Sequence, residues 1–146
     1  MSQVSIDRLF GGLQASSSAM RAERVRMDVI SENLAGARVT KTPEGGPYRR
    51  KVVRFEPLMR RNDAGQQVVV GVRAAHVTPD FETPMQELQI EGHPDADENG
   101  MVTMPNVNTL AEMADMITAM RTYEANLGAQ RNFVESVERV LQFARS

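Results

Sequence analysis

An apolar residue recurs at every seventh position near each end of this 146-residue chain. The first series is Ile6, Leu13, Met20, Met27 and Leu34, and the second is Met113, Met120, Leu127, Val134 and Leu141. A sustained seven-residue apolar repeat is typical of a helix that supercoils on a partner helix. The sequence therefore predicts one long coiled-coil-like helix at each end, packed antiparallel or offset on each other or on neighbouring chains.

The N-terminal helix is expected over residues 5–35, with Ile30 adding to a partial second apolar seam. Gly36 follows the last seam residue, a natural position for a C-terminal cap. Three serines, residues 16–18, lie in mid-helix, where their hydroxyls compete for backbone hydrogen bonds. An isolated helix of this kind is marginal in water, so we expect the terminal helices to fold upon assembly.

The C-terminal helix is expected to start near Asn108. Thr109 and Glu112 have the spacing of a capping box, in which each side chain satisfies a free backbone donor. No proline interrupts the helix after that point. Further apolar positions widen its stripe, namely Leu110, Met116, Ile117, Tyr123 and Val137.

The middle of the chain contains every proline and reads as loop and strand. Residues 50–55 and 66–74 are β-rich, and Asp63 to Gly65 lies between them as a turn signal. Residues 87–91 alternate polar and apolar, which predicts a half-buried strand. We therefore expect an α+β fold with a helix in residues 1–36, a small β-rich domain in residues 37–105 and a helix in residues 106–146.

Charge is unevenly distributed along the chain, although the formal net charge is only −2. Residues 37–61 hold eight Lys or Arg and two Glu, whereas residues 62–115 hold ten Asp or Glu and Arg73 alone. These blocks can face each other within one chain, lie in solvent, or meet between subunits. The small net charge speaks against nucleic acid as a partner.

The composition excludes several kinds of site. The chain has no cysteine, so disulfides and thiolate metal sites are ruled out. Asp7 and Arg8 interrupt the N-terminus where a cleaved signal peptide needs an apolar stretch. No run approaches the ~20 apolar residues that span a bilayer, and we expect no membrane insertion.

Two segments contain candidate ligand or catalytic side chains. Asp95 to Gly100 resembles the opening of a calcium loop, but Asn106 stands where a bidentate glutamate is required at the twelfth position. A polar turn is favoured, with a calcium-binding secreted module as an alternative. An enzyme using His93 would need companion residues, and His76 is the only other histidine. We expect no catalytic activity, no cofactor and no bound metal.

Specific residues resemble the flagellar rod and hook proteins. Asn33-Leu34-Ala35 at the end of the first helix is similar to their Asn-Leu-Ala signature, although Gly36 replaces the usual Asn. A second signature is similar in spacing along the C-terminal helix, at Glu112, Met113, Met116, Ile117, Ala119, Arg121, Tyr123, Ala125 and Asn126. Residues 92–97 and 104–107 resemble the proximal-rod subunits in particular.

The resemblance implies a structural subunit of the bacterial flagellar basal body that polymerises through its terminal helices into the drive shaft between membrane ring and hook. The implied partners are other rod subunits, copies of the chain itself, the rod–membrane-ring adaptor and the flagellar type III export apparatus. Export without a cleaved signal would place the chain in the periplasmic rod. A subunit of another rod layer is the nearest alternative.

The residues expected at the assembly interface combine both seams with the signature. They are Ile6, Leu13, Met20, Met27, Ile30, Asn33 and Leu34 in the first helix, and Leu110, Met113, Ile117, Met120, Tyr123, Leu127, Val134 and Leu141 in the second.

Overall fold

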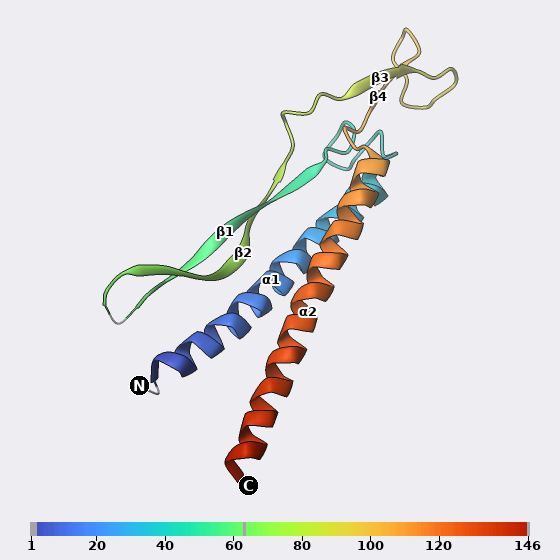
Figure 1. Cartoon of the computed structure of the whole chain (residues 1–146). Coiled ribbons are helices and arrows are strands. Elements are labelled where there is room, and N and C mark those ends of the chain that lie inside the picture. The colour runs from blue at the N-terminus through green and yellow to red at the C-terminus, as the bar shows by residue number, and fades with distance from the viewer. Residues whose placement is uncertain (1–2, 63, 146) are drawn as a thin grey trace.

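The computed structural model describes residues 3–62 and 64–145, with side chains for residues 10–62 and 64–144. Two long helices, one at each end of the chain, lie side by side, and the four strands between them in sequence lie outside this pair (Figure 1). The elements in chain order are α1 Gln3–Gly36, β1 Lys51–Arg61, β2 Gln67–Pro79, β3 Gln86–Gln89, β4 Met101–Met104 and α2 Thr109–Arg145. The α+β prediction of two terminal helices around a small β-rich middle is confirmed.

The helices α1 and α2 pack on each other within one chain and run antiparallel. Asn33 of α1 contacts Glu112 near the start of α2, and Arg26, two turns earlier in α1, contacts Asp115. The two helices lie together near the C-terminal end of α1 and separate toward the chain termini (Figure 1). The free ends of both helices therefore have less cover than the ends that meet.

Strands β1 and β2 form one long antiparallel hairpin that runs beside α1 (Figure 1). Both strands extend beyond the predicted β-rich runs, and the ladder is irregular near Arg54 and Leu58. Gly65 in the connecting turn has a φ of 74°, a left-handed conformation that favours glycine. Asp63, the first residue of the predicted turn signal, lies outside the described residues.

Ser18 explains how a serine in mid-helix contributes to the fold. Its hydroxyl oxygen accepts a hydrogen bond from the backbone N–H of Val72 in β2, at 3.1 Å. Gly71 lies directly against the same side chain, where a Cβ atom would collide with the hydroxyl. The serine therefore joins α1 to the hairpin instead of only weakening the helix.

Strands β3 and β4 form a second, smaller antiparallel pair that contacts neither helix. This pair lies beyond the end where α1 and α2 meet (Figure 1). The strand predicted over residues 87–91 is present as β3, but Leu88 is 46% exposed, so the expectation that this strand is half-buried was wrong. The cross-strand partner of Leu88, Val102 in β4, is 1% exposed, so the apolar side is covered at β4 and open at β3.

The start of α2 differs from the predicted capping box. Asn108 is the N-cap, because its side-chain oxygen accepts hydrogen bonds from the N–H groups of Leu110 and Ala111, each at 3.1 Å. Glu112 turns its carboxylate inward to other partners. The motif was read one residue too late because Thr109 has the same capping chemistry as Asn108.

The end of α1 also differs from its expected form. Gly36 is the last helical residue and its φ is not positive, so it does not act as a left-handed cap. A Cβ atom there would lie 2.5 Å from the ring of Tyr48. Gly36 is therefore required by the close approach of the tyrosine and not by the helix stop.

Candidate assembly surface

A buried asparagine joins α1 to the start of the hairpin and to α2. The amide of Asn33 donates to the Lys51 carbonyl at 2.9 Å and to the Glu112 carboxylate at 3.0 Å. Its oxygen accepts from the Lys51 N–H at 2.8 Å and from the Tyr48 hydroxyl at 3.0 Å. Both donors and both acceptor positions of the side chain are thus occupied.

Glu112 is the second centre of this network and is 1% exposed. Its other oxygen accepts from Arg50 Nε at 2.6 Å. Arg50 also reaches Asp80 at 3.5 Å and Asp115 at 4.0 Å. Burial lowers the pKa of Arg50, but the hydrogen bonds and charges of Glu112 and Asp80 outweigh it and keep that pKa above its ordinary value.

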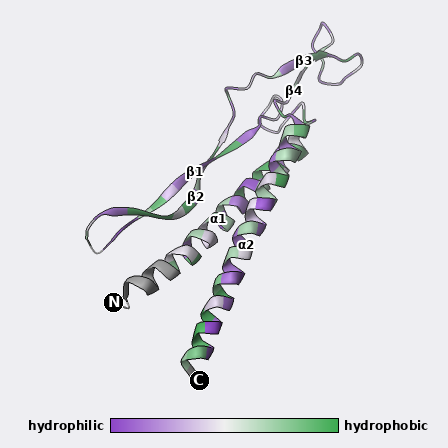
Figure 2. Cartoon of the chain, in the orientation of Figure 1, coloured by the Kyte–Doolittle hydropathy of each residue, from purple (hydrophilic) through white to green (hydrophobic). Residues whose placement is uncertain are grey.

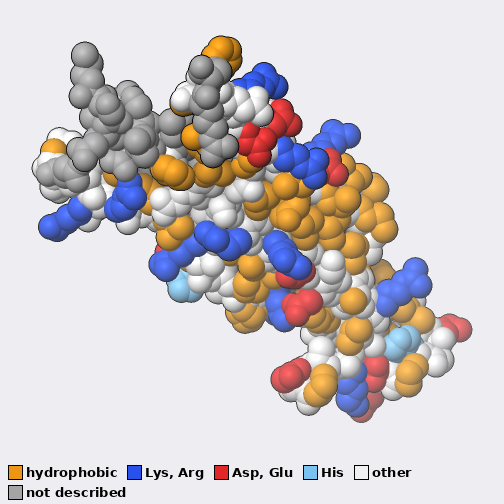
Figure 3. Space-filling view, turned by 90° about the horizontal axis from the view of Figure 1, so that it is seen from below, with side chains coloured by type: hydrophobic (Ala, Val, Ile, Leu, Met, Phe, Trp, Pro, Cys, Tyr) orange, Lys and Arg blue, Asp and Glu red, His pale blue; other side chains and the backbone are white. Residues whose placement is uncertain are grey.

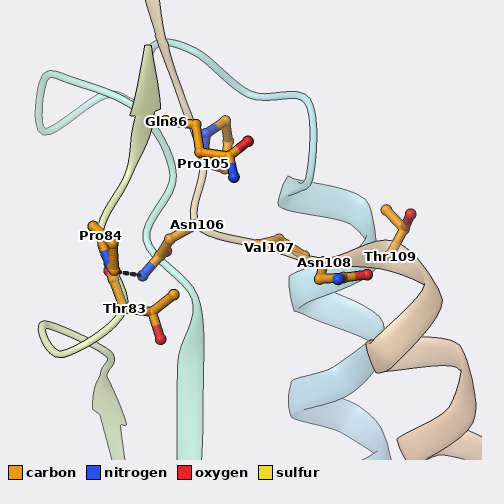
Figure 4. Close-up of a pocket in the computed structure, with 8 residues that line it drawn as sticks. All are labelled: Thr83, Pro84, Gln86, Pro105, Asn106, Val107, Asn108 and Thr109. Atoms are coloured by element: carbon orange, nitrogen blue, oxygen red, sulfur yellow. Dashed lines mark hydrogen bonds between the residues drawn. The ribbon is translucent and has the colours of Figure 1, made fainter.

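Asn106 holds the hairpin from the other side. Its oxygen accepts from the Arg50 N–H at 2.8 Å, and its amide donates to the carbonyls of Asp80 and Thr83 at 3.0 Å each. Figure 4 shows Asn106, in the segment that leads from β4 into α2, reaching toward Thr83. The start of β1 is therefore clamped between two buried asparagines, Asn33 and Asn106.

The same segment borders a recess of about 440 Å³ (Figure 4). Its lining is Thr83, Pro84, Gln86, Pro105, Asn106, Val107, Asn108 and Thr109, which includes no ionisable side chain. It offers no acid, base or nucleophilic carboxylate at its wall.

Besides the buried polar network, the candidate assembly surface has an apolar stripe on α2 that faces outward. Hydrophobic residues continue along α2 to its C-terminal end (Figure 2), and the face seen from below carries a broad hydrophobic patch (Figure 3). Met120 is typical of the stripe at 48% exposed. The stripe consists of Leu110, Met113, Ile117, Met120, Val134 and Leu141, all exposed, with Tyr123 and Leu127 half-buried beside it.

The inner face of α2 is one residue out of phase with that stripe. Glu112 and Ala119 are buried and seven residues apart, one position before Met113 and Met120 respectively. One residue corresponds to about 100° of rotation around a helix. The apolar heptad thus lies beside the face that packs on α1, and the chain itself does not cover it.

The predicted residues of α1 are placed differently. Leu13, Met20, Met27 and Leu34 are half-buried. Ile30 is 4% exposed and Asn33 1% exposed, so both are already enclosed within one chain. Ile6 lies outside the residues whose side chains are described.

The network residues Arg50, Asp80 and Asn106 were not among the predicted site residues. No sequence signal pairs them, because the contacts that join them to one another span 26 to 56 positions along the chain. Glu112 and Asn33 each belong to a signature that resembles the rod proteins, but nothing in their spacing indicates that they bond to each other.

The calcium-like segment uses its carboxylates for local structure. Asp97 accepts from the N–H groups of Asn99 and Met101, at 2.8 Å each, and these bonds lower the pKa of Asp97. Asp95 accepts from the Thr40 hydroxyl at 2.7 Å. Within the described part of the chain, no three His, Asp or Glu side chains are grouped so that they could hold a metal.

Among the described helices, none is both long and apolar enough to cross a membrane. The basic block is partly neutralised inside the chain, since Arg50 binds three carboxylates and Lys51 binds Glu32 at 2.8 Å.

Comparison with known proteins agrees with this architecture. The family described as flagellar basal body rod FlgEFG protein, C-terminal, matches residues 98–133. The rod protein FlgC of Borreliella burgdorferi is 36% identical, covering 92% of this chain and 98% of its own length. FlgC of Aquifex aeolicus is 38% identical over 92% of this chain and 96% of its own length. FlgC of Salmonella typhimurium is 38% identical over 77% and 80%.

Two terminal helices of this form and a match to the rod family define a flagellar axial protein. More particularly, the chain belongs to the FlgC family of flagellar basal-body rod proteins. It is a structural subunit of the flagellar proximal rod, so the predictions of family and function are confirmed.

Proposed function

We propose that the outward apolar stripe of α2 is the surface through which this subunit polymerises into the drive shaft between membrane ring and hook. The observation that supports it is the exposure of Met113, Ile117 and Met120. They lie beside the face of α2 that already packs on α1, where Glu112 and Ala119 are buried. Large exposed apolar patches rimmed by polar residues mark protein contacts. Burial against neighbouring helices would stabilise the assembly by about 0.8 kcal/mol per CH₂ group.

We propose that different segments of the chain have different roles. Residues 1–36 and 106–146 carry assembly, and residues 37–105 form the domain that projects from the helices. In α1, the half-buried seam of Leu13, Met20, Met27 and Leu34 would be completed by neighbours, together with Ile6. Ile30 and Asn33 act inside the subunit, where they hold α1 against its partners.

The proposed partners follow from the same role. They are other rod subunits, copies of this chain, the rod–membrane-ring adaptor and the type III export apparatus. Export without a cleaved signal would deliver the chain to the periplasmic rod. We propose no catalytic activity, because the surfaces that stand out are apolar or structural.

The substitution Met120→Glu tests this proposal. It places a charge in the stripe, and burying an unpaired charge costs several kcal/mol, so the subunit is expected to be absent from purified basal bodies and the cells non-motile. Met120 is half exposed in the free chain, so the thermal midpoint of the purified variant should stay close to that of the parent.

Thr118→Glu is the matched control. Thr118 is exposed on the same helix and lies about 200° around it from Met120. This variant adds the same charge and should still be incorporated. Intact basal bodies from the Met120→Glu strain would refute the proposed surface.

A further inference from the structure

Some charges of the basic and acidic blocks pair within the subunit, and others do not. Arg49 stacks on the ring of Phe81 at 4.6 Å, and Arg50 and Lys51 bind carboxylates. These three cations, in the middle of the basic block, therefore have partners within one chain. Among the other cations of this block, Arg38 and Lys41 lie in the loop after α1, whereas Arg54, Arg60 and Arg61 lie farther along the hairpin.

The hairpin is the cationic end of the subunit. Residues 51–79 contain five Lys or Arg against Glu56 and Asp63. Arg60 and Arg61 end β1 beside the hairpin turn, are exposed, and form no ion pair with any described residue. Two adjacent free guanidinium groups thus mark the tip of the hairpin.

The β3–β4 unit is the anionic end. Residues 80–108 contain seven Asp or Glu, and no Lys or Arg occurs between Arg73 and Arg121. Glu87, Glu91 and Glu98 are exposed and have no ion pair within the described part of the chain. The carboxylates of Asp80 and Asp97 are occupied by local contacts, and that of Asp95 by the Thr40 hydroxyl from the loop after α1.

The two ends cannot neutralise each other within one subunit. The hairpin tip lies toward the N-terminal end of α1, whereas β3 and β4 lie beyond its opposite end (Figure 1). The β3–β4 pair contacts neither helix and neither strand of the hairpin. Opposite free charges at opposite ends of an elongated molecule favour contact between copies.

We propose that the hairpin tip, at Arg60 and Arg61, docks on the β3–β4 end, at Glu87 and Glu91, of a second copy of this chain. Such a head-to-tail contact joins two different surfaces, and when its rotation does not close it generates a helical array. The inference rests on the proposed polymerisation, to which it adds a second contact that sets which copy follows which. Charge complementarity mainly governs register and partner choice.

Cysteine cross-linking in assembled basal bodies tests the geometry. The chain has no native cysteine, so the double variant Ala64→Cys/Glu98→Cys should give a ladder of disulfide-linked oligomers after oxidation. Each single variant should stay monomeric, because a head-to-tail contact never brings two identical positions together. Absence of the ladder, or dimers in a single variant, would overturn the proposal.

Charge reversal in the Ala64→Cys/Glu98→Cys variant tests whether opposite charges hold the two ends together. Arg60→Glu/Arg61→Glu and Glu87→Arg/Glu91→Arg should each lower the cross-link yield on the order of tenfold. Combining all four substitutions in one chain restores complementarity and should restore the yield. Unchanged yields in both reversed variants, or no recovery in the combined one, would contradict the contact.

Failure of this inference is distinct from failure of the proposed function. If Met120→Glu blocks assembly, but intact basal bodies with the double cysteine variant show no cross-link, the proposed apolar surface is supported and the head-to-tail contact is wrong. If the reversed chains are excluded from rods but the double cysteine variant gives no ladder, the charged ends bind a different subunit and the second-copy proposal is wrong.

Discussion

At the scale of single residues, the fold depends on a few saturated polar side chains and not on a large core. Within the described part of the chain, the buried apolar side chains are Ala22, Val29, Ile30, Val102, Pro105 and Ala119. Asn33, Asn106 and Glu112 are buried with them and carry the contacts between elements. Removing one partner from such a network leaves the others desolvated and unpaired.

Replacing Glu112 by alanine should therefore be severely destabilising. It leaves Arg50 and one amide donor of Asn33 without their buried partner, and breaking a buried ion pair typically costs about 3–5 kcal/mol. Urea unfolding of the monomer measures the change. Glu32→Ala is the control, because Glu32 pairs with Lys51 at the surface and should cost at most about 1 kcal/mol. Similar losses in the two variants would show that the network is not cooperative.

Glu23 should give stability an unusual pH dependence. It is 8% exposed, one of its oxygens has no hydrogen-bond partner, and burial raises its pKa above the ordinary 4.5 despite the nearby Arg26. A raised folded-state pKa favours the folded protein at low pH, and that advantage is lost as pH rises through the folded pKa. At neutral pH the charged form thus opposes folding.

Glu23→Gln should consequently raise the thermal midpoint at pH 7, and the gain should shrink as pH approaches 4. Thermal unfolding of both proteins across this range measures the difference. A gain that is constant with pH would mean that packing, and not charge, is responsible.

At the scale of elements, both helix ends are determined by contacts with distant residues. The last turn of α1 is limited by Tyr48, which follows it after a loop, and the first turn of α2 directs Glu112 toward α1 and β1. Helix rules predicted where both helices begin and end to within a few residues. They did not predict which side chains face inward there.

Two glycine-to-alanine substitutions distinguish the effect of a tertiary contact at a helix end from the effect of helix propensity. Gly36→Ala should destabilise the monomer by about 1–3 kcal/mol, because the new methyl group collides with the Tyr48 ring. Gly128→Ala in α2 meets nothing within 4 Å and should stabilise by about 0.5–1 kcal/mol through helix propensity. Denaturant midpoints compare the two. Equal effects of the same sign would contradict the packing role of Gly36.

At the scale of the whole molecule, the helices meet at one end and diverge at the other (Figure 1). Residues 134–144 of α2 are all exposed, whereas residues 18–36 and 109–126 include the buried positions of the helix pair. Local stability follows such differences in cover. We therefore propose that folding upon assembly, if it occurs in this chain, is confined to the free ends of the helices.

Hydrogen exchange on the dilute monomer should show this gradient. Amides in residues 18–36 and 109–126 are expected to be protected, and those in residues 134–145 to exchange rapidly, with protection at the free end appearing only in assembled rods. Uniform protection of α2 in a verified monomer would mean that preformed helices dock as rigid bodies.

The sequence by itself determined the two long helices, the β-rich middle and the family, because period-seven apolar spacing, proline placement and signature residues are local properties. The phase of α2 was decided only by tertiary structure, since a heptad shows that a stripe will be buried but not against which chain. The same holds for the Asn33–Glu112–Arg50 network. Its members are far apart in sequence, and only packing of α1, β1 and α2 brings their polar groups out of water and makes each dependent on the others.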